Sequence, residues 1–235
     1  MSNLVQISGI LAIIGAAIYA IGDVLLLADK VGPVKSLTGL LVDLTGYPPL
    51  QRRAHRLVAM ARLPRWRLVW GGLLGVFAAP LTLAGVWQVY QGLQPAGIWW
   101  ALPPTLLFAY ATVIGPFIHG SFIHLGATVQ TLNALQEADR PLLVEELIQQ
   151  QTILLIAYSV LFVCLILASL WFSVAVGWGQ TRFPWWMVAV NPLTITLAWL
   201  ASKKFLPQRL ADYTEGAGFN IAYIIFFGLT TAMLW

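Results

Sequence analysis

Apolar residues gather in six long runs along the chain, and short segments that hold most of the charged residues separate these runs. Each run is close to, or longer than, the ~20 residues that an α-helix needs to cross a bilayer. The pattern predicts an all-α, polytopic membrane helix bundle with six transmembrane helices, forming a single integral membrane domain over residues 1–235. The six runs are Val5–Ala28, Leu68–Leu93, Ile98–Thr128, Thr152–Val176, Pro184–Ser202 and Ala217–Trp235.

Two segments between the runs have helical apolar patterns of their own. In Leu50–Leu63 the apolar residues fall near one helical face and the arginines mostly elsewhere, as in a helix that lies on anionic lipid headgroups. A simpler interpretation is that these arginines only set the topology. The second pattern begins near Asp139, a residue type that caps helices, and runs through Leu147. We expect two cytoplasmic interfacial helices.

Composition supports a membrane protein, and the placement of charge predicts its orientation. Hydrophobic residues make up 59% of the chain and charged residues only 9%, against about 25% charged in soluble domains. Twelve of the 13 basic residues lie in the segments after the first, third and fifth runs, and Arg182 is the exception. By the positive-inside rule these segments are cytoplasmic and both termini lie outside, in a bacterial-type cytoplasmic (inner) membrane. Because the basic residues lie beside the ends of spans, membrane lipids are the expected partners and nucleic acid is not.

Ionisable residues inside the apolar runs mark a candidate site. His119 and His124 lie in the third run, where a charged side chain costs about 2.5–3.5 kcal/mol at a helix centre and therefore usually faces a site, a cavity or a partner. Asp23 lies late in the first run, whereas Glu215 and Asn220 lie at the start of the last. In the predicted topology all five share one layer near the cytoplasmic face. Such a layer could form an acid–base pair, a proton relay or a metal site.

Each of these residues also has a purely structural interpretation. Asp23 could pair with Lys30 or an arginine, Glu215 could cap the last helix, and the Asn220 amide could join two helices. The functional hypothesis assigns catalytic roles to four residues and substrate-binding roles to four others. The candidate catalytic residues are His119, His124, Asp23 and Glu215, and the candidate substrate-binding residues are Asn220, Tyr223, Tyr110 and Tyr19.

A metal site would draw on His119, His124 and Asp23, with Zn or Fe as the expected ion. Positions five apart on a regular α-helix differ by about 140° in azimuth, so the two histidines could share one ion only across a π-bulge. Pro116, one turn before His119, is a place where the helix could be disturbed. Alternatively, one histidine could ligate haem or chlorophyll.

Four blocks of sequence carry a resemblance to a known family. They are Gly22–Leu26, Gly85–Tyr90, Phe183–Pro192 and Gly218–Ile221. In these blocks the chain resembles an uncharacterised family of bacterial multi-pass integral membrane proteins, which places a histidine after a Phe-Ala-Tyr stretch, here Phe108–Tyr110 followed by His119. The resemblance implies a membrane fold and carries no activity. A looser similarity to membrane hydrolases of the alkaline ceramidase type would imply hydrolysis, but those proteins have seven spans and a His-x3-His pair, where this chain has His-x4-His.

Three functions are open on this sequence. The leading hypothesis is an intramembrane enzyme that acts on a lipid or other apolar small molecule through the cytoplasm-side polar layer. The second is a small-molecule transporter or binding protein that uses the layer as a protonatable gate. The third is a cofactor-holding subunit of a membrane complex. A homo-oligomer or a larger membrane complex is compatible with each of them.

Overall fold

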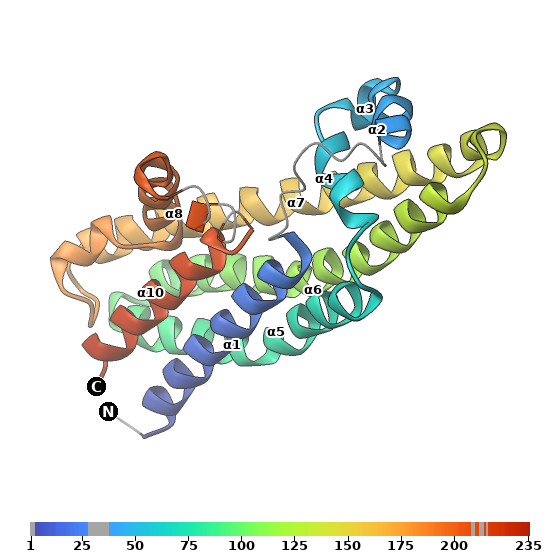
Figure 1. Cartoon of the computed structure of the whole chain (residues 1–235). Helices are drawn as coiled ribbons and strands as arrows, with labels where there is room; N and C mark the ends of the chain where they lie inside the picture. Colours follow the sequence, from blue (N-terminus) through green and yellow to red (C-terminus); the bar gives the residue numbers. More distant parts are fainter. Residues whose placement is uncertain (1–2, 28–37, 208–209, 212–213, 215) are drawn as a thin grey trace.

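The computed structural model describes residues 3–27, 38–207, 210–211, 214 and 216–235, and within these ranges the chain forms helices and connections without a strand. The predicted all-α class is therefore confirmed for the described part of the chain. Among the described residues, four helices are long and apolar enough to cross a membrane. They are α1 (Asn3–Leu27), α5 (Arg65–Leu93), α6 (Ile98–Ala134) and α7 (Arg140–Gly177), and they make up the body of the protein (Figure 1).

The long helices pack in chain order, α1 on α5, α5 on α6 and α6 on α7, while α10 (Gly218–Met233) packs on α1. Glycines allow the closest approach between α1 and α5. A Cβ at Gly22 would lie only 2.8 Å from the carbonyl oxygen of Gly71, so the two backbones are in direct contact. Asp23 is the next residue in α1, so this contact fixes its position beside α5.

The fifth apolar run, Pro184–Ser202, does not form one spanning helix. A 3-10 turn, η4 (Trp185–Ala189), is followed by a break and by α8 (Pro192–Ser202), whose 11 residues cover only about 16 Å. The break has a local cause, because Asn191 and Thr194 form a capping box that starts a new helix with Pro192 in its first turn. Figure 1 shows α8 nearly end-on, so it runs across the direction of α7. The last run forms α10, whose 16 residues also make it a short helix.

The predicted interfacial helix over Leu50–Leu63 is broken and packs on protein. The chain forms α2 (Thr38–Thr45), α3 (Pro48–Gln51) and α4 (Ala54–Met60), with a turn between α3 and α4. The expected apolar face exists, since Leu50, Ala54, Leu57 and Val58 are all buried. It is covered by the bundle, because these residues belong to a core cluster with residues of α1, α5, α6 and α7.

The second predicted interfacial helix is not separate from the fourth span. After a 3-10 turn, η3 (Glu137–Asp139), helix α7 runs without a break from Arg140 to Gly177. Asp139 precedes the helix but its side chain makes no capping hydrogen bond. No proline or glycine separates Leu147 from Thr152, so a change from polar to apolar sequence does not end the helix.

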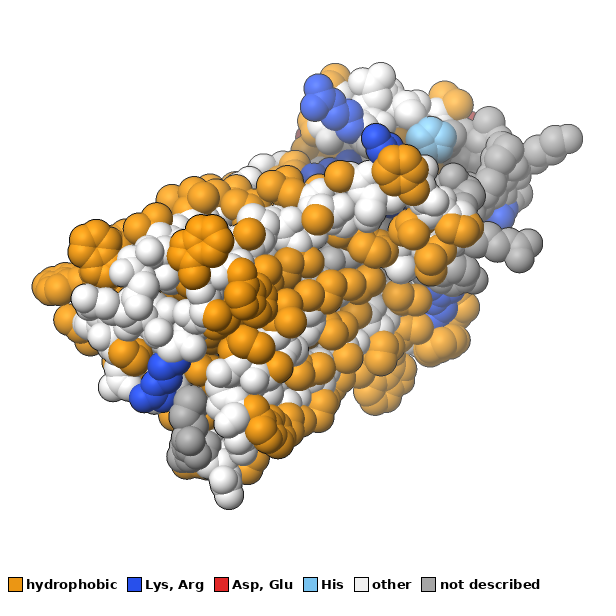
Figure 2. All heavy atoms as spheres, turned by 90° about the vertical axis from the view of Figure 1, so that its left-hand side faces the viewer, with side chains coloured by type: hydrophobic (Ala, Val, Ile, Leu, Met, Phe, Trp, Pro, Cys, Tyr) orange, Lys and Arg blue, Asp and Glu red, His pale blue; other side chains and the backbone are white. Residues whose placement is uncertain are grey.

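The two ends of the bundle differ. Helix α1 begins and α10 ends at the same end, whereas α2, α3 and α4 project at the opposite end (Figure 1). Asp43 on α2 forms an ion pair with Arg140 at the start of α7, which ties the projecting helices to the long ones. Figure 2 shows hydrophobic side chains over the helical body and several basic side chains on the projecting part. A surface of this kind suits a body surrounded by lipid chains.

Candidate functional site

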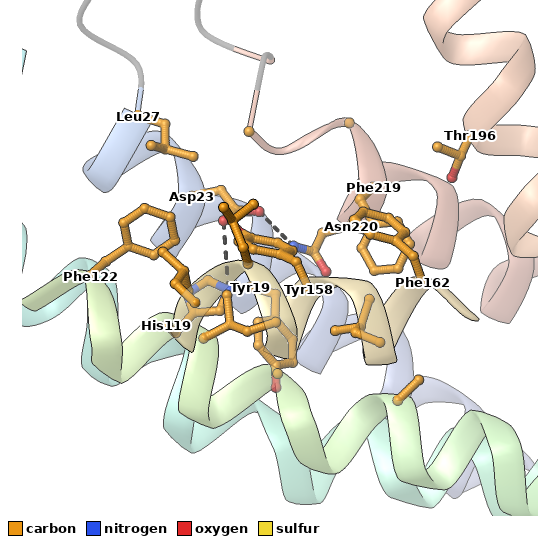
Figure 3. Close-up of a pocket in the computed structure, with 18 of the residues that line it drawn as sticks. Tyr19, Asp23, Leu27, His119, Phe122, Tyr158, Phe162, Thr196, Phe219 and Asn220 are labelled. Carbon is orange, nitrogen blue, oxygen red and sulfur yellow. Dashed lines mark hydrogen bonds and ion pairs between the residues drawn. The ribbon is translucent and has the colours of Figure 1, made fainter. Parts of the chain in front are cut away.

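A buried carboxylate joins the first helix to the last. The Nδ2 amide of Asn220 on α10 donates a hydrogen bond to Oδ2 of Asp23 on α1 at 2.6 Å (Figure 3). Both residues are only 8% exposed. A buried carboxylate needs such donors, because an unsatisfied one is costly. The bond also fixes the direction of the other carboxylate oxygen, Oδ1.

That second oxygen faces an imidazole. Nε2 of His119 on α6 lies 3.6 Å from Oδ1 of Asp23, and Nδ1 of the same ring lies 3.4 Å from the carbonyl oxygen of Gly71 on α5. The Asp23–His119 distance is longer than an ordinary direct hydrogen bond, so a water or hydroxyl group could bridge the two. The three side chains Asp23, His119 and Asn220, from α1, α6 and α10, therefore converge at one place, as Figure 3 shows.

The imidazole lies in a space that glycines on α5 leave open. A Cβ at Gly75 would fall on the ring of His119, and a Cβ at Gly72 would lie 2.9 Å from the His119 carbonyl oxygen. On the opposite side, a Cβ at Gly22 would lie 3.6 Å from Cε1 of the same ring. Because these glycines have no side chains, His119 can reach between α5 and α1 to Asp23. A list of candidate site residues drawn only from ionisable residue types would not include the glycines.

Tyr19 extends the polar cluster along α1. Its ring lies 5.0 Å from the His119 ring, centroid to centroid, at an interplanar angle of 55°. Its hydroxyl is buried and has no hydrogen-bond partner among the described residues. Gly115 on α6 makes room for this hydroxyl, since a Cβ there would lie 2.8 Å from it. A bound molecule with a polar group could supply the missing partner.

These residues line a cavity of about 790 Å³, a size suited to a small molecule or part of a lipid. Asp23 is the only carboxylate on the cavity wall among the described residues. Most of the wall is apolar, and α6 and α7 contribute the largest shares of the lining residues. A row of aromatic rings in edge-to-face contact lies along one side of the cavity. The ring centroids of Phe162 on α7 and Phe219 on α10 are 5.8 Å apart, and those of Phe219 and Tyr223 are 5.1 Å apart.

The structure brings five of the eight predicted site residues together on this wall: Asp23, His119, Asn220, Tyr19 and Tyr223. His124 and Tyr110 are exposed and lie off the cavity wall, so the structure does not bring them together with the other five. The reason is helical rotation, because α6 is a regular α-helix here and has no π-bulge near Pro116. Glu215, the remaining candidate, lies outside the described residues.

The same rotation bears on the predicted metal ligands. Among the described residues no group of three or more His, Cys, Asp or Glu side chains comes together as a set of metal ligands. His119 and Asp23 lie side by side, but His124 is exposed and does not line the cavity. The three-residue set expected for Zn or Fe is therefore not assembled by this fold.

Other cavity residues were not marked by the sequence as part of a site. Tyr158 lies midway along α7, in an uninterrupted apolar stretch that does not distinguish it. Arg53 and Arg56 were predicted to face lipid headgroups, whereas the structure places both on the cavity wall. Their only sequence signal was an arginine-rich segment beside a membrane span.

Comparison with known proteins gives a family and no activity. Residues 1–235 match the model of a family described as a family of unknown function (DUF6796). No curated protein and no solved structure shows significant similarity to the chain.

Proposed function

We propose that this chain, which belongs to the family of unknown function (DUF6796), is an intramembrane enzyme that performs acid–base chemistry on a lipid or similar apolar substrate. One observation carries the proposal. A carboxylate and an imidazole, Asp23 and His119, lie 3.6 Å apart on the wall of a mostly apolar cavity of about 790 Å³. Ionisable groups are costly in such surroundings, and a purely structural role could be filled by neutral residues.

The arrangement has the parts of a general base. An imidazole can accept a proton from water or a substrate hydroxyl, and a neighbouring carboxylate stabilises the imidazolium that forms. Asn220 holds Asp23 from behind, and Gly71 lies near the second ring nitrogen of His119. In the proposed step, the oxygen of the deprotonated water or hydroxyl attacks the substrate and forms a new bond. The bond from the attacked atom to a leaving oxygen breaks, and the His119 imidazolium gives its proton to that leaving oxygen.

The proposed membrane placement has both termini outside and the site near the cytoplasmic face. Helices α1, α5, α6 and α7 each cross once, and α10 provides a shorter crossing. We propose that η4 and α8 together carry the chain back between α7 and α10, in place of a continuous fifth helix. The common end of α1 and α10 in Figure 1 supports an even number of crossings. The ion pair of Asp43 with Arg140 supports a common side for the connecting segments after the first and third runs.

The test compares two histidines on one helix. His119→Ala and Asp23→Asn should abolish turnover, while His124→Ala serves as the matched control because His124 is exposed and off the cavity wall. Each variant is expressed in the same bacterial host, and membrane lipids are compared by mass spectrometry with those of cells that carry the wild-type chain or none. We expect a lipid change with the wild type and His124→Ala that disappears with the other two variants.

Melting curves of the purified variants show whether each one still folds. Lipid profiles that are identical for the wild type, His119→Ala and cells without the protein would contradict the enzyme hypothesis. A lipid that co-purifies unchanged with all folded variants would instead favour binding or transport.

A further inference from the structure

One part of the cavity wall is strongly basic. Arg53 and Arg56, from the α3–α4 segment, line the cavity together with Lys203 at the end of α8. Nη1 of Arg53 lies 3.2 Å from Oε1 of Gln151 on α7, to which it donates a hydrogen bond, so its guanidinium group is held against the cavity wall. The described part of the wall thus carries three basic side chains and one carboxylate, Asp23.

Tyr158 shares the cavity wall with both the arginines and the Asp23–His119 pair. This α7 side chain lines the same cavity as Asp23, Arg53 and Arg56. Figure 3 shows Tyr158 among the lining side chains, together with Asp23 and His119. One bound molecule could therefore reach the arginines with an anionic group and the Asp23–His119 pair with a neighbouring polar group.

The cavity wall between α7 and α8 is apolar. Leu155 and Phe162 on α7 and Leu200 on α8 line the cavity, and they are 37%, 41% and 59% exposed. Such exposed side chains on the cavity wall indicate that the cavity is open on this side. In a membrane-embedded bundle these surroundings are acyl chains, so an apolar chain can extend from the cavity between α7 and α8.

We propose that the cavity binds a phospholipid, with its phosphate group held by Arg53 and Arg56 and its acyl chain lying between α7 and α8. The proposal rests on the proposed function and names its substrate class. Guanidinium groups match phosphate oxygens in geometry and charge, and Lys203 adds a third cation on the same wall. Inorganic phosphate shares the headgroup chemistry, but it would make no use of the apolar wall, which is why we favour a lipid.

The experiment measures binding and needs no turnover. Detergent-purified protein is titrated with phosphatidic acid or with a diacylglycerol of the same chains, and bound lipid is counted by native mass spectrometry. We expect phosphatidic acid to bind more tightly than the diacylglycerol. Each of Arg53→Gln and Arg56→Gln should weaken phosphatidic acid binding about fivefold, the effect of losing roughly 1 kcal/mol per basic residue. Arg52→Gln is the matched control, because Arg52 is an exposed neighbour that does not line the cavity.

Three results of this binding experiment would overturn the lipid proposal. Competition by millimolar inorganic phosphate that displaces the lipid completely would assign the site to free phosphate and overturn the lipid proposal. Equal affinities for the two lipids, or equal losses in Arg52→Gln and Arg56→Gln, would also overturn it. Because Arg53 donates a hydrogen bond to Gln151, melting curves of both arginine variants check that each one still folds.

The two proposals fail separately. His119→Ala should retain phosphatidic acid binding within about twofold, because the phosphate is held elsewhere on the wall. Retained binding with no turnover by the wild type would contradict the enzyme and leave the lipid site standing. Turnover without a headgroup preference would contradict the lipid site alone.

Discussion

Gly75 on α5 and His119 on α6 are packed so closely that a Cβ at position 75 would coincide with the imidazole ring. A Cβ at Gly22 on α1 would also lie 3.6 Å from Cε1 of this ring, and the ring lies beside Asp23. Three helices thus meet around one histidine. The position of the imidazole is set by the absence of side chains on its neighbours.

The first prediction follows from this contact. Gly75→Ala should destabilise the protein by about 1–3 kcal/mol, because a new methyl group must displace either the ring or a helix. Gly120→Ala on α6 is the matched control, since a Cβ there meets nothing within 4 Å and alanine favours a helix. Thermal unfolding in detergent measures both.

A double-mutant cycle identifies the cause of the loss. If the imidazole is what the methyl group strikes, Gly75→Ala should cost much less in a His119→Ala background. An equal cost in both backgrounds would contradict the close contact.

The second prediction concerns the hydrogen bond between Asn220 and Asp23. Asn220→Ala should cost about 1–3 kcal/mol, because it leaves a buried carboxylate without its donor. The exchanged pair, Asp23→Asn with Asn220→Asp, restores an amide and a carboxylate in contact. We expect the exchanged protein to recover stability relative to Asn220→Ala.

The exchanged protein should nevertheless lose turnover. Its carboxylate now starts from α10 and no longer faces Nε2 of His119. Unfolding curves and the lipid analysis are measured on the same preparations. An exchanged protein with full turnover would show that the position of the carboxylate next to His119 is not needed.

The third prediction concerns orientation. Cys164, the single cysteine, is buried and is first replaced by alanine. New cysteines are then placed by Arg52→Cys and Arg182→Cys, one in each kind of connecting segment. If the basic segments are cytoplasmic, a membrane-impermeant maleimide should label position 182 in intact cells and position 52 only after the cells are opened. The reverse pattern would invert the proposed topology.

Much of the helical body could be predicted from hydropathy. The first run, Val5–Ala28, corresponds to α1 at Asn3–Leu27, and the second and third runs begin within a few residues of α5 and α6. Prediction failed where hydropathy carries no information on helix ends. Asn191 and Pro192 interrupt an apolar run with a capping box, whereas the polar residues before Thr152 continue a helix that the pattern divided.

For the site, the order of the runs predicted the level along the bundle at which each residue lies. It did not predict the rotation of each helix about its axis, and therefore not which side chains point inward. Depth alone placed Asp23, His119 and Asn220 in one layer, and these three side chains meet in the structure. His124 shared the layer by the same argument and yet is exposed, as is Tyr110. Which face of α6 turns inward depends on where α5 leaves room, and that is a property of two helices packed together.

The sequence by itself determined that the chain is helical and apolar, where its long helices lie and at which level along those helices its buried ionisable groups fall. These are properties of single segments, because hydropathy and helix length are summed along the chain. Only the tertiary structure decided which of those groups touch, that the arginines of the α3–α4 segment line the cavity and that His124 does not. These depend on rotation about helix axes and on contacts between segments distant in sequence, such as Asp23 with Asn220, and close packing alone settles them.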